Sequence, residues 1–590
     1  MGPRPLPLVG ISANERWRRS PAPGDFGLVC RCVTRYGTDL WGRILEAITI
    51  ILVLLVAVIA SSFIARATGN IFPIPLVQIV LGALVAQIFS FQISLAPEIF
   101  FLLFVAPLLF LDGWRIPREG LFRDKWTILS LAFGLVLFTV LGAGILLHWL
   151  IPTIPLPVAF ALAAVLSPTD AVAVSALAAR VTIPKRLMHI LEGESLLNDA
   201  SGLVCLRFAI AAAVTGGFSI IDASTTFLWL AIGGIGFGIM TALLANAAKD
   251  WTARHFGEET GTQILISLLI PFGAYLVAER LAASGILACV AAGVVMNREE
   301  RSGRASAATR IRRAAVWDAL QFASNGVVFV LLGHQLPGIL AGAGQAIRQT
   351  TQKNEFWLVF YVVVLSVALA LLRALWAWVT LRLMRFRATR NHSVSMTPGW
   401  RLTAVTSLAG VRGAVSLAGV MTLPLSLQNG AAFPTRDLVI LLAAGVIIVT
   451  LLAANIGLPF LTKGTRLPPE MPAWREESNA RLAAARAAIA AMERAPHDQE
   501  TGTQEEELSV QAATRIIARY RQQIETRLTT GEDARLASRS DEIERKLHLV
   551  ALRAERNELY RIAHSGQLTE EVTRVLVREV DLQESLFSVR

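Results

Sequence analysis

Three short polar segments interrupt otherwise apolar stretches of the chain. They read Ser-Pro-Thr-Asp at 167–170, Glu-Ser-Leu-Leu-Asn-Asp at 194–199 and Gly-Val-Arg-Gly at 410–413. An ionisable side chain inside a membrane-spanning helix is costly unless it faces a partner or a cavity, so each segment is a functional hypothesis. Carboxylate, hydroxyl and carbonyl oxygens are ligands for hard cations. The apolar stretches contain no cluster of His and Cys, which argues against a membrane-embedded hydrolase.

The first segment predicts a broken helix. Pro168 has no backbone N–H, so the carbonyl one turn earlier loses its donor. Freed carbonyls beside Ser167, Thr169 and Asp170 would suit a cation. The alternative interpretation is a kinked helix in which Asp170 only caps the break.

The second segment offers two different faces of one helix. Ser195 and Asp199 are four positions apart and share a face, with Asn198 beside them. Glu194 points about 140° away from Asp199. One face could therefore bind an ion while Glu194 pairs with a cation; alternatively, Glu194 lies near the interface and reaches water.

The third segment places an arginine, which stays charged, in the middle of a predicted transmembrane helix. Arg412 lies between Gly410 and Gly413, and its guanidinium needs a carboxylate or freed carbonyls. The glycines would permit a second helix break that matches the one at Pro168.

The elements that carry these segments are those of an all-α polytopic membrane protein. The chain has 590 residues, 54% of them hydrophobic and 17% charged, with a mean hydropathy of +0.54. These values are far from the balance of a soluble protein. Stretches long enough to span a bilayer predict about thirteen transmembrane helices, at 45–66, 71–91, 97–114, 126–151, 157–179, 187–214, 224–248, 262–281, 283–297, 315–336, 356–384, 401–424 and 436–462.

The net charge of +11 reflects membrane topology rather than nucleic-acid binding, because the basic residues gather in short loops between apolar runs. The positive-inside rule places five basic loops in the cytoplasm. We divide the chain into an N-terminal extension at 1–42, expected to be disordered, a transmembrane domain at 43–463 and a helical cytoplasmic tail at 464–590. Thirteen spans would leave the basic N-terminal extension outside, which conflicts with the same rule.

The predicted topology relates the two helix breaks. Helices four to six and eleven to thirteen run in opposite senses, and each triplet has its break in the middle helix. This pattern indicates inverted repeats in which two discontinuous helices cross near the midplane around an ion site. Asp112 and Asp318, at the ends of predicted helices, are interpreted as interfacial.

The three motifs, in this order and placement, resemble the signature motifs of the monovalent cation/proton antiporters, and are most similar to the bacterial NhaP type, which is related to the animal sodium/proton exchangers. The resemblance covers roughly Leu45 to Leu461. It implies a secondary transporter, not an enzyme, that uses no cofactor. It also implies a homodimer in the bacterial inner membrane, in which a core moves against the remaining helices.

The resemblance also assigns residues. It implies that Asp199 is the carboxylate that binds Na⁺ or a proton, and that Glu194 and Arg412 form a structural ion pair. The other residues of the implied ion site are Thr169, Asp170, Ser195 and Asn198. An asparagine at 198 goes with electroneutral one-for-one exchange in this family. Potassium in place of sodium stays an alternative, and a gated cation channel is a weaker one because the predicted site is asymmetric.

Overall fold

The computed structural model is described here over residues 48–69, 72–89, 97–116, 124–170, 185–215, 220–300, 306–349, 356–390, 400–424, 433–462, 473–494, 503–528, 532–565, 567–568 and 570–588. The chain divides into two compact units, Met1–Arg466 and Leu467–Arg590. The predicted N-terminal extension at 1–42 and residues 171–179 of the predicted helix at 157–179 lie outside the described residues.

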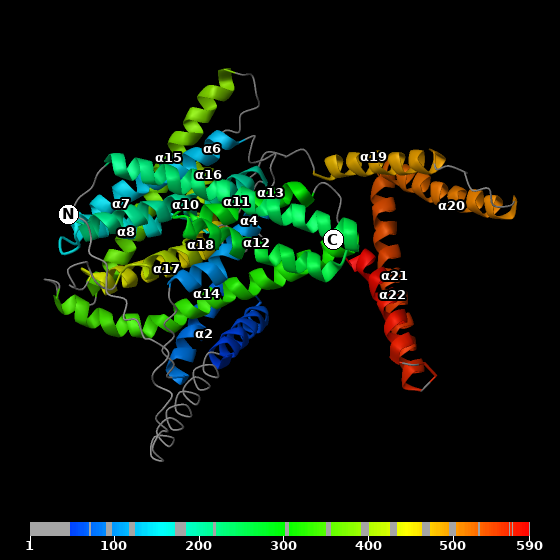
Figure 1. Ribbon diagram of the computed structural model, residues 1–590, viewed down its shortest axis with the longest axis horizontal. Helices are drawn as coiled ribbons and strands as arrows, with labels where there is room; N and C mark the ends of the chain where they lie inside the picture. The colour runs from blue at the N-terminus through cyan, green and yellow to red at the C-terminus, as the bar shows by residue number, and fades with distance from the viewer. Residues whose placement is uncertain are drawn as a thin grey trace, which may run out of the picture. The chain divides into compact units, whose positions relative to one another are not determined.

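The first unit is built from helices that run side by side in a bundle (Figure 1). After a first helix at Ile48–Ala67, its elements are α2 (Ile74–Ile88), α3 (Pro97–Phe100), the π-helical turn η1 (Phe101–Val105), α4 (Ala106–Arg115), α6 (Lys125–Leu129), the π-helical segment η2 (Ser130–Leu135), α7 (Val136–Leu150), α8 (Leu156–Leu166), α10 (Lys185–Thr215), α11 (Ile220–Phe256), α12 (Thr260–Arg280), α13 (Gly285–Glu300), α14 (Ala307–Gln349), α15 (Phe356–Arg390), α16 (Trp400–Leu408), α17 (Ala414–Met421) and α18 (Arg436–Thr462).

Each of the thirteen predicted segments contains helix, but the lengths differ from the prediction. Among the described residues, eight helices are long and apolar enough to cross a membrane, and Ile74–Ile88 and Leu156–Leu166 are shorter apolar helices. The 43 residues of α14 would extend for about 65 Å, about twice the hydrocarbon thickness. The number of spans and the inverted repeats stay predictions.

Large apolar side chains cover much of the outside of this unit. On α11, Trp229, Ile232 and Leu244 are each more than half exposed. Such a surface would be unfavourable in water, but it suits contact with lipid acyl chains. The exposed apolar side chains and the long apolar helices both fit a membrane-embedded unit.

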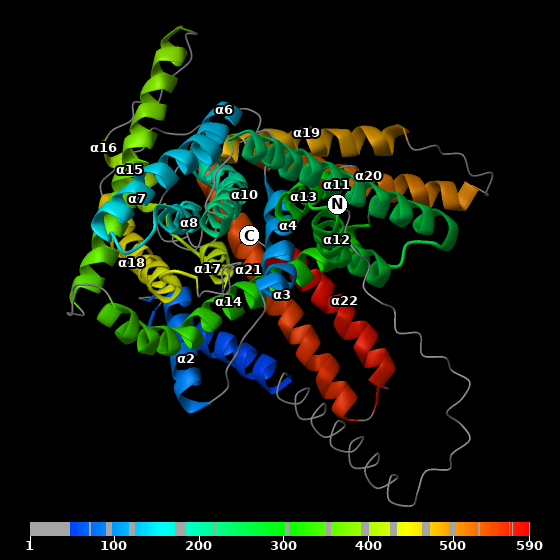
Figure 2. The same ribbon diagram turned by 60° about the vertical axis from the view of Figure 1, so that its left-hand side comes forward.

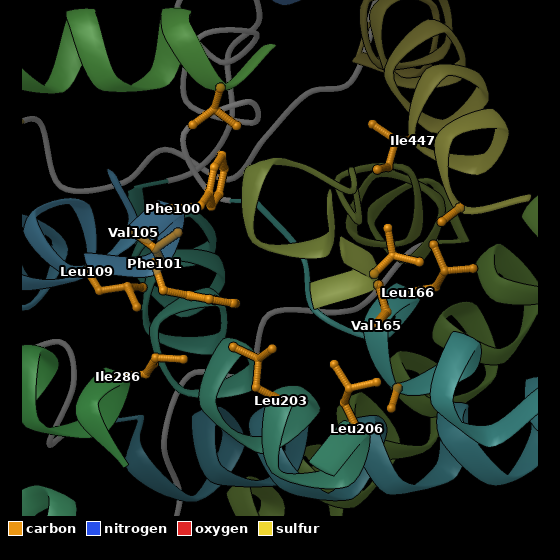
Figure 3. Packing of buried hydrophobic residues seen from close by; sticks show 14 of the residues in the cluster. Phe100, Phe101, Val105, Leu109, Val165, Leu166, Leu203, Leu206, Ile286 and Ile447 are labelled. Carbon is orange, nitrogen blue, oxygen red and sulfur yellow. The ribbon is translucent and has the colours of Figure 1, made fainter. Parts of the chain in front are cut away.

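The interior joins the helices that carry the polar segments. Figure 3 shows Val105 and Leu109 lying across from Leu203 of α10, while Val165 and Leu166 of α8 lie near Ile447 of α18. All six of these residues belong to one cluster of buried apolar side chains. The packed interior holds α8, α10 and α18 together around the two helix breaks.

The second unit is helical and is described by itself. It contains α19 (Ala473–Arg494), α20 (Thr503–Leu528), α21 (Glu532–His564) and α22 (Glu570–Ser588). The last two lie side by side in both ribbon views (Figures 1 and 2). Their contact buries Leu552, Val577 and Val580, and Arg556 of α21 donates hydrogen bonds to Asp581, at 2.8 Å, and to Glu584 of α22.

Candidate ion-binding site

Two interruptions of helical structure meet in the first unit. Helix α8 ends at Leu166, two residues before Pro168, and a non-helical stretch separates α16 from α17. The backbone N–H of Asp170 donates a hydrogen bond of 2.8 Å to the carbonyl of Val411. Two segments more than two hundred residues apart in sequence are thus joined through backbone atoms that regular helices would have used internally.

Glycine allows this close approach. A Cβ atom at Gly413 would overlap the side chain of Asp170, and one at Gly202 of α10 would overlap the ring of Pro168. The absence of these side chains lets the two breaks and α10 pack against one another. The predicted break residues Pro168, Gly410 and Gly413 therefore all lie at or beside the junction.

Helix α10 holds the first break by side-chain hydrogen bonds. Ser195 Oγ donates to the carbonyl of Thr169 at 2.6 Å, and Asn198 Nδ2 donates to Thr169 Oγ1 at 2.9 Å. All three side chains are buried. Asn198 thereby fixes Thr169, while its own Oδ1 has no hydrogen-bond partner in the described part of the chain.

A small internal pocket lies at this junction, and three carboxylates line it. They are Asp170 at the break, Asp199 of α10 and Asp112 of α4. Asp199 is 7% exposed, and within the described residues its carboxylate accepts no hydrogen bond and forms no ion pair. The remaining lining residues are Val105, Leu108, Leu109, Pro168, Thr169, Ser195, Asn325, Gly413, Val415 and Ser416.

The pocket offers a mixed set of oxygen atoms. Within the described residues, no group of three acidic, His or Cys side chains converges closely enough to hold a metal ion. The residues that line the pocket carry carboxylate, hydroxyl and carbonyl oxygens, which is the kind of ligand set that hard cations accept. Of the predicted site residues, Asp199, Asp170, Thr169 and Ser195 line the pocket, and Asn198 contacts it through Thr169.

The interpretation of Asp112 as an interfacial residue is wrong, because this residue lines the same pocket as Asp199. Val105, Leu109 and Asp112 are spaced four and three positions apart, so one helix face meets the pocket. Sequence analysis also missed Asn325 of α14 and Ser416 of α17. Ser416 follows the quoted Gly410–Gly413 segment by three residues, but no local signal distinguished Asn325.

The predicted ion pair of Glu194 has a different partner. Glu194 is fully buried, and its carboxylate accepts two hydrogen bonds from Arg373 of α15, the one from Nη2 at 2.8 Å. Arg373 Nε also donates to the carbonyl of Thr406 in α16 at 2.9 Å. This two-pronged ion pair links α10, α15 and α16 beside the second break. The position of Arg373 within an apolar stretch made it a candidate partner, but Arg412 shares that feature.

Arg412 uses a freed carbonyl instead of a carboxylate. Its Nη1 donates to the carbonyl of Gly410 at 3.0 Å, and its side chain is 3% exposed. Its backbone N–H donates to Thr450 Oγ1 of α18 at 3.4 Å. Of the two partners that the sequence allowed for this guanidinium, the carbonyl is the one observed. The Glu194–Arg412 pairing is therefore incorrect in this structure.

The close contact at Gly413 gives a first testable expectation. Gly413→Ala would put a methyl group where the Asp170 side chain lies, so we expect most exchange to be lost and the free energy of unfolding to fall by about 1–3 kcal/mol. The measurements are proteoliposome exchange and detergent unfolding. Gly236→Ala of α11 is the matched control because a Cβ there meets no atom of the described residues within 4 Å. Equal behaviour of the two variants would contradict the predicted role of the close contact.

The profile of the family described as "Sodium/hydrogen exchanger, transmembrane" matches residues 38–464. This chain belongs to that family. A sodium/hydrogen exchanger of Escherichia coli strain K12, YjcE, whose function is uncharacterised, is 38% identical over 550 residues, which cover 92% of this chain and 99% of that relative.

A second relative of the exchanger family has a more explicit name. The "Sodium, potassium, lithium and rubidium/H(+) antiporter" of Bacillus subtilis strain 168 is 37% identical over 92% of this chain and 78% of its own length. Among solved structures, the sodium proton antiporter MjNhaP1 of Methanocaldococcus jannaschii at pH 8 aligns with a TM-score of 0.50 at 18% identity. The alignment covers 70% of this chain and 97% of the MjNhaP1 chain, which shows that the two share a fold. The chain is a multi-pass membrane transporter of monovalent cations and protons.

Proposed function

We propose that this exchanger moves Na⁺ in one direction and a proton in the other through competition at Asp199. The observation that carries the proposal is the pocket in which this buried carboxylate faces hydroxyl and carbonyl oxygens at a helix break. A carboxylate that holds either a proton or a cation, but not both, couples the two flows by itself. Further chemistry is unnecessary.

The neighbouring residues divide into ligands and supports. Asp199 supplies the exchangeable charge, while Thr169, Ser195 and Asp170 supply oxygens from both sides of the pocket. Asp112 adds a third carboxylate, and its charge interacts with those of Asp170 and Asp199. Asn198 supports the site by its hydrogen bond to Thr169.

Na⁺/H⁺ exchange of one for one is the expected stoichiometry. Asn198 occupies the position beside Asp199 with a neutral amide, so the α10 segment carries a single group that titrates at the ion site. When one Na⁺ replaces one proton, the loaded site carries the same charge in both directions of travel.

Transport requires the site to face each side of the membrane in turn. We propose that the helices carrying the two breaks move against the remaining helices, in a homodimer located in the bacterial inner membrane with the tail after residue 463 in the cytoplasm. The backbone bond between Asp170 and Val411 supports this proposal because it ties both breaks into one unit that can move together.

Potassium exchange is the second candidate. The Bacillus subtilis relative is named for sodium, potassium, lithium and rubidium, so its name includes a cation much larger than sodium. The deciding experiment is exchange in proteoliposomes with sodium, lithium, potassium or rubidium chloride at equal ionic strength. We expect the highest apparent affinity for sodium. A higher affinity for potassium would replace this part of the proposal, and uptake uncoupled from protons would favour a channel.

Competition and stoichiometry predict the pH and voltage dependence. On the acidic side of the site's titration, apparent cation affinity should weaken by about tenfold per pH unit, and it should level off on the alkaline side. At fixed cation concentration, the exchange rate should rise and then fall as pH increases, because low pH depletes the bound cation and high pH depletes the bound proton.

The voltage test uses liposomes of balanced composition with a potassium/valinomycin diffusion potential, sodium as the transported cation and an internal pH dye. We expect the voltage to drive no net exchange. A voltage-driven pH change that needs Asp199 would exclude one-for-one exchange and identify a second proton carrier, for which Asp170 and Asp112 are the candidates.

A further inference from the structure

A second cavity, distinct from the ion pocket, lies among four helix ends. Its volume is about 550 Å³, within the range of small-molecule binding sites. It is formed near the end of α11, the start of α12, the end of α13 and the start of α14. Its lining residues are Lys249, Asp250, Ala253, Arg254, Glu258, Gln263, Glu299, Glu300 and Arg313. None of these residues lines the ion pocket.

The carboxylates around this cavity already have partners. Glu300 pairs with Arg313, and Glu258 accepts hydrogen bonds from the Ser306 backbone N–H at 3.1 Å and from Thr309 Oγ1 at 2.8 Å. These hydrogen bonds lower the pKa of Glu258 and keep it ionised. Asp250 and Glu299 have interactions of their own. The acidic residues are therefore engaged by the protein.

The cationic side chains Arg313 and Lys249, in contrast, have fewer hydrogen-bond acceptors among the described residues than they have N–H donors. Arg313 is 1% exposed, and its Nε and Nη1 have no hydrogen-bond partner in the described structure. Trp114 faces the guanidinium at 5.5 Å but cannot accept from its N–H edges as an oxygen would. Lys249 is 7% exposed and donates only to Asn246 Oδ1, at 3.3 Å. Among the described residues, no carboxylate lies within ion-pair distance of its Nζ, and the charges of Glu299, Asp250 and Glu300 act on it only from farther away.

Buried donors without acceptors are costly, and so is a buried ammonium such as Lys249 whose printed acceptor among the described residues is a neutral amide. A ligand that brings several anionic oxygens would meet both needs, because a guanidinium fork and an ammonium group are the usual protein partners of phosphate. Neutral or cationic ligands would leave Lys249 and the two Arg313 nitrogens as they are. Because the carboxylates of the cavity already have partners while N–H donors of Lys249 and Arg313 still lack acceptors, we expect the ligand to be an oxyanion.

We propose that this cavity binds a phosphate group through Lys249 and Arg313, with Arg254 at its edge. The group belongs to a phospholipid headgroup or to a soluble phosphate compound. Arg313 precedes Asn325 of the ion pocket by twelve residues on α14, about 18 Å along the helix, so this site is separate from the transported ions. The assignment does not depend on the proposed exchange mechanism.

The test uses the purified, delipidated full-length protein in detergent and follows thermal unfolding against inorganic phosphate concentration. Phosphate stabilises proteins generally by exclusion from their surfaces, so the readout is the difference between wild type and Lys249→Gln. We expect a saturable rise in melting temperature for the wild type and an apparent phosphate affinity at least tenfold weaker for Lys249→Gln. Arg313→Gln should show the same loss. If it does not fold, Lys249→Gln decides the test by itself.

Arg312→Gln is the matched control, because Arg312 is exposed on the same helix and does not line the cavity. Native mass spectrometry separates the sources: phospholipid retained by wild type but not by Lys249→Gln identifies a headgroup, whereas a phosphate shift without such lipid identifies a soluble compound. Identical phosphate responses in wild type, Lys249→Gln and Arg312→Gln, together with identical lipid retention, would overturn the proposal.

Discussion

Asp199→Asn should abolish exchange while leaving a folded, membrane-inserted protein. The amide is nearly the same size as the carboxylate, so the packing of α10 should persist, but it can neither take up a proton near neutral pH nor neutralise a cation. We expect the cation-driven pH change in proteoliposomes to fall to that of protein-free liposomes. The melting temperature in detergent should stay close to that of the wild type.

The matched control for this variant is Asp318→Asn, which removes a carboxylate whose side chain is 65% exposed. We expect that variant to retain exchange. Retained exchange in Asp199→Asn would show that another carboxylate carries the coupled ion, and the assignment of Asp199 would have to be given up.

The second large effect concerns stability. Arg373→Ala should lower the free energy of unfolding by about 3–5 kcal/mol, because it leaves the fully buried Glu194 carboxylate without its counterion. Glu194→Ala should cost a similar amount by isolating Arg373. Exchange should fall in both variants, since the pair holds α10 against α15 and α16 beside the ion pocket.

A double-mutant cycle identifies the partner of Glu194. We expect a coupling energy of about 1–3 kcal/mol between Glu194→Gln and Arg373→Gln, and a much smaller one between Glu194→Gln and Arg412→Gln. Unfolding in a fixed detergent supplies the free energies. A larger coupling with Arg412 would show that the pairing observed here is not the one that stabilises the protein in solution.

Much of the ion pocket could be predicted from local sequence. Thr169, Asp170, Ser195 and Asp199 are polar residues in apolar stretches, and the cost of burying them made each a candidate before any fold was considered. Pro168 predicted the end of α8 because it cannot donate within a helix. These inferences depend only on neighbours within one or two helical turns.

The partner of Glu194 could not be predicted in this way. Arg373 and Arg412 are both guanidinium groups within apolar stretches, and sequence spacing does not say which one reaches a carboxylate on a distant helix. The outcome depends on how α15 and α16 pack against α10. Arg412 lies at a break whose freed carbonyl accepts from its Nη1, whereas Arg373 lies within regular helix, where the carbonyls of its own helix are already used.

The position of Asp112 depends on how deep its helix lies in the membrane, and the sequence alone does not determine that depth. A residue near the end of an apolar run is expected at the membrane surface only if the helix crosses the bilayer squarely. Tilt and depth are set by packing against other helices. Here the helix face that carries Val105 and Asp112 lies against the two breaks, so the carboxylate is internal.

The π-helical turn η1, immediately before α4, affects how Asp112 should be compared with residues of other exchangers. A π turn holds one residue more than the α turn it replaces, and it arises naturally from a single-residue insertion. Every side chain that follows is displaced by about 100° around the helix axis relative to an uninterrupted helix. In relatives without this insertion, the residue that faces the pocket would stand one position away from the one that an ungapped alignment pairs with Asp112. A missing acid in such an alignment can therefore reflect the helix register and not a different chemistry.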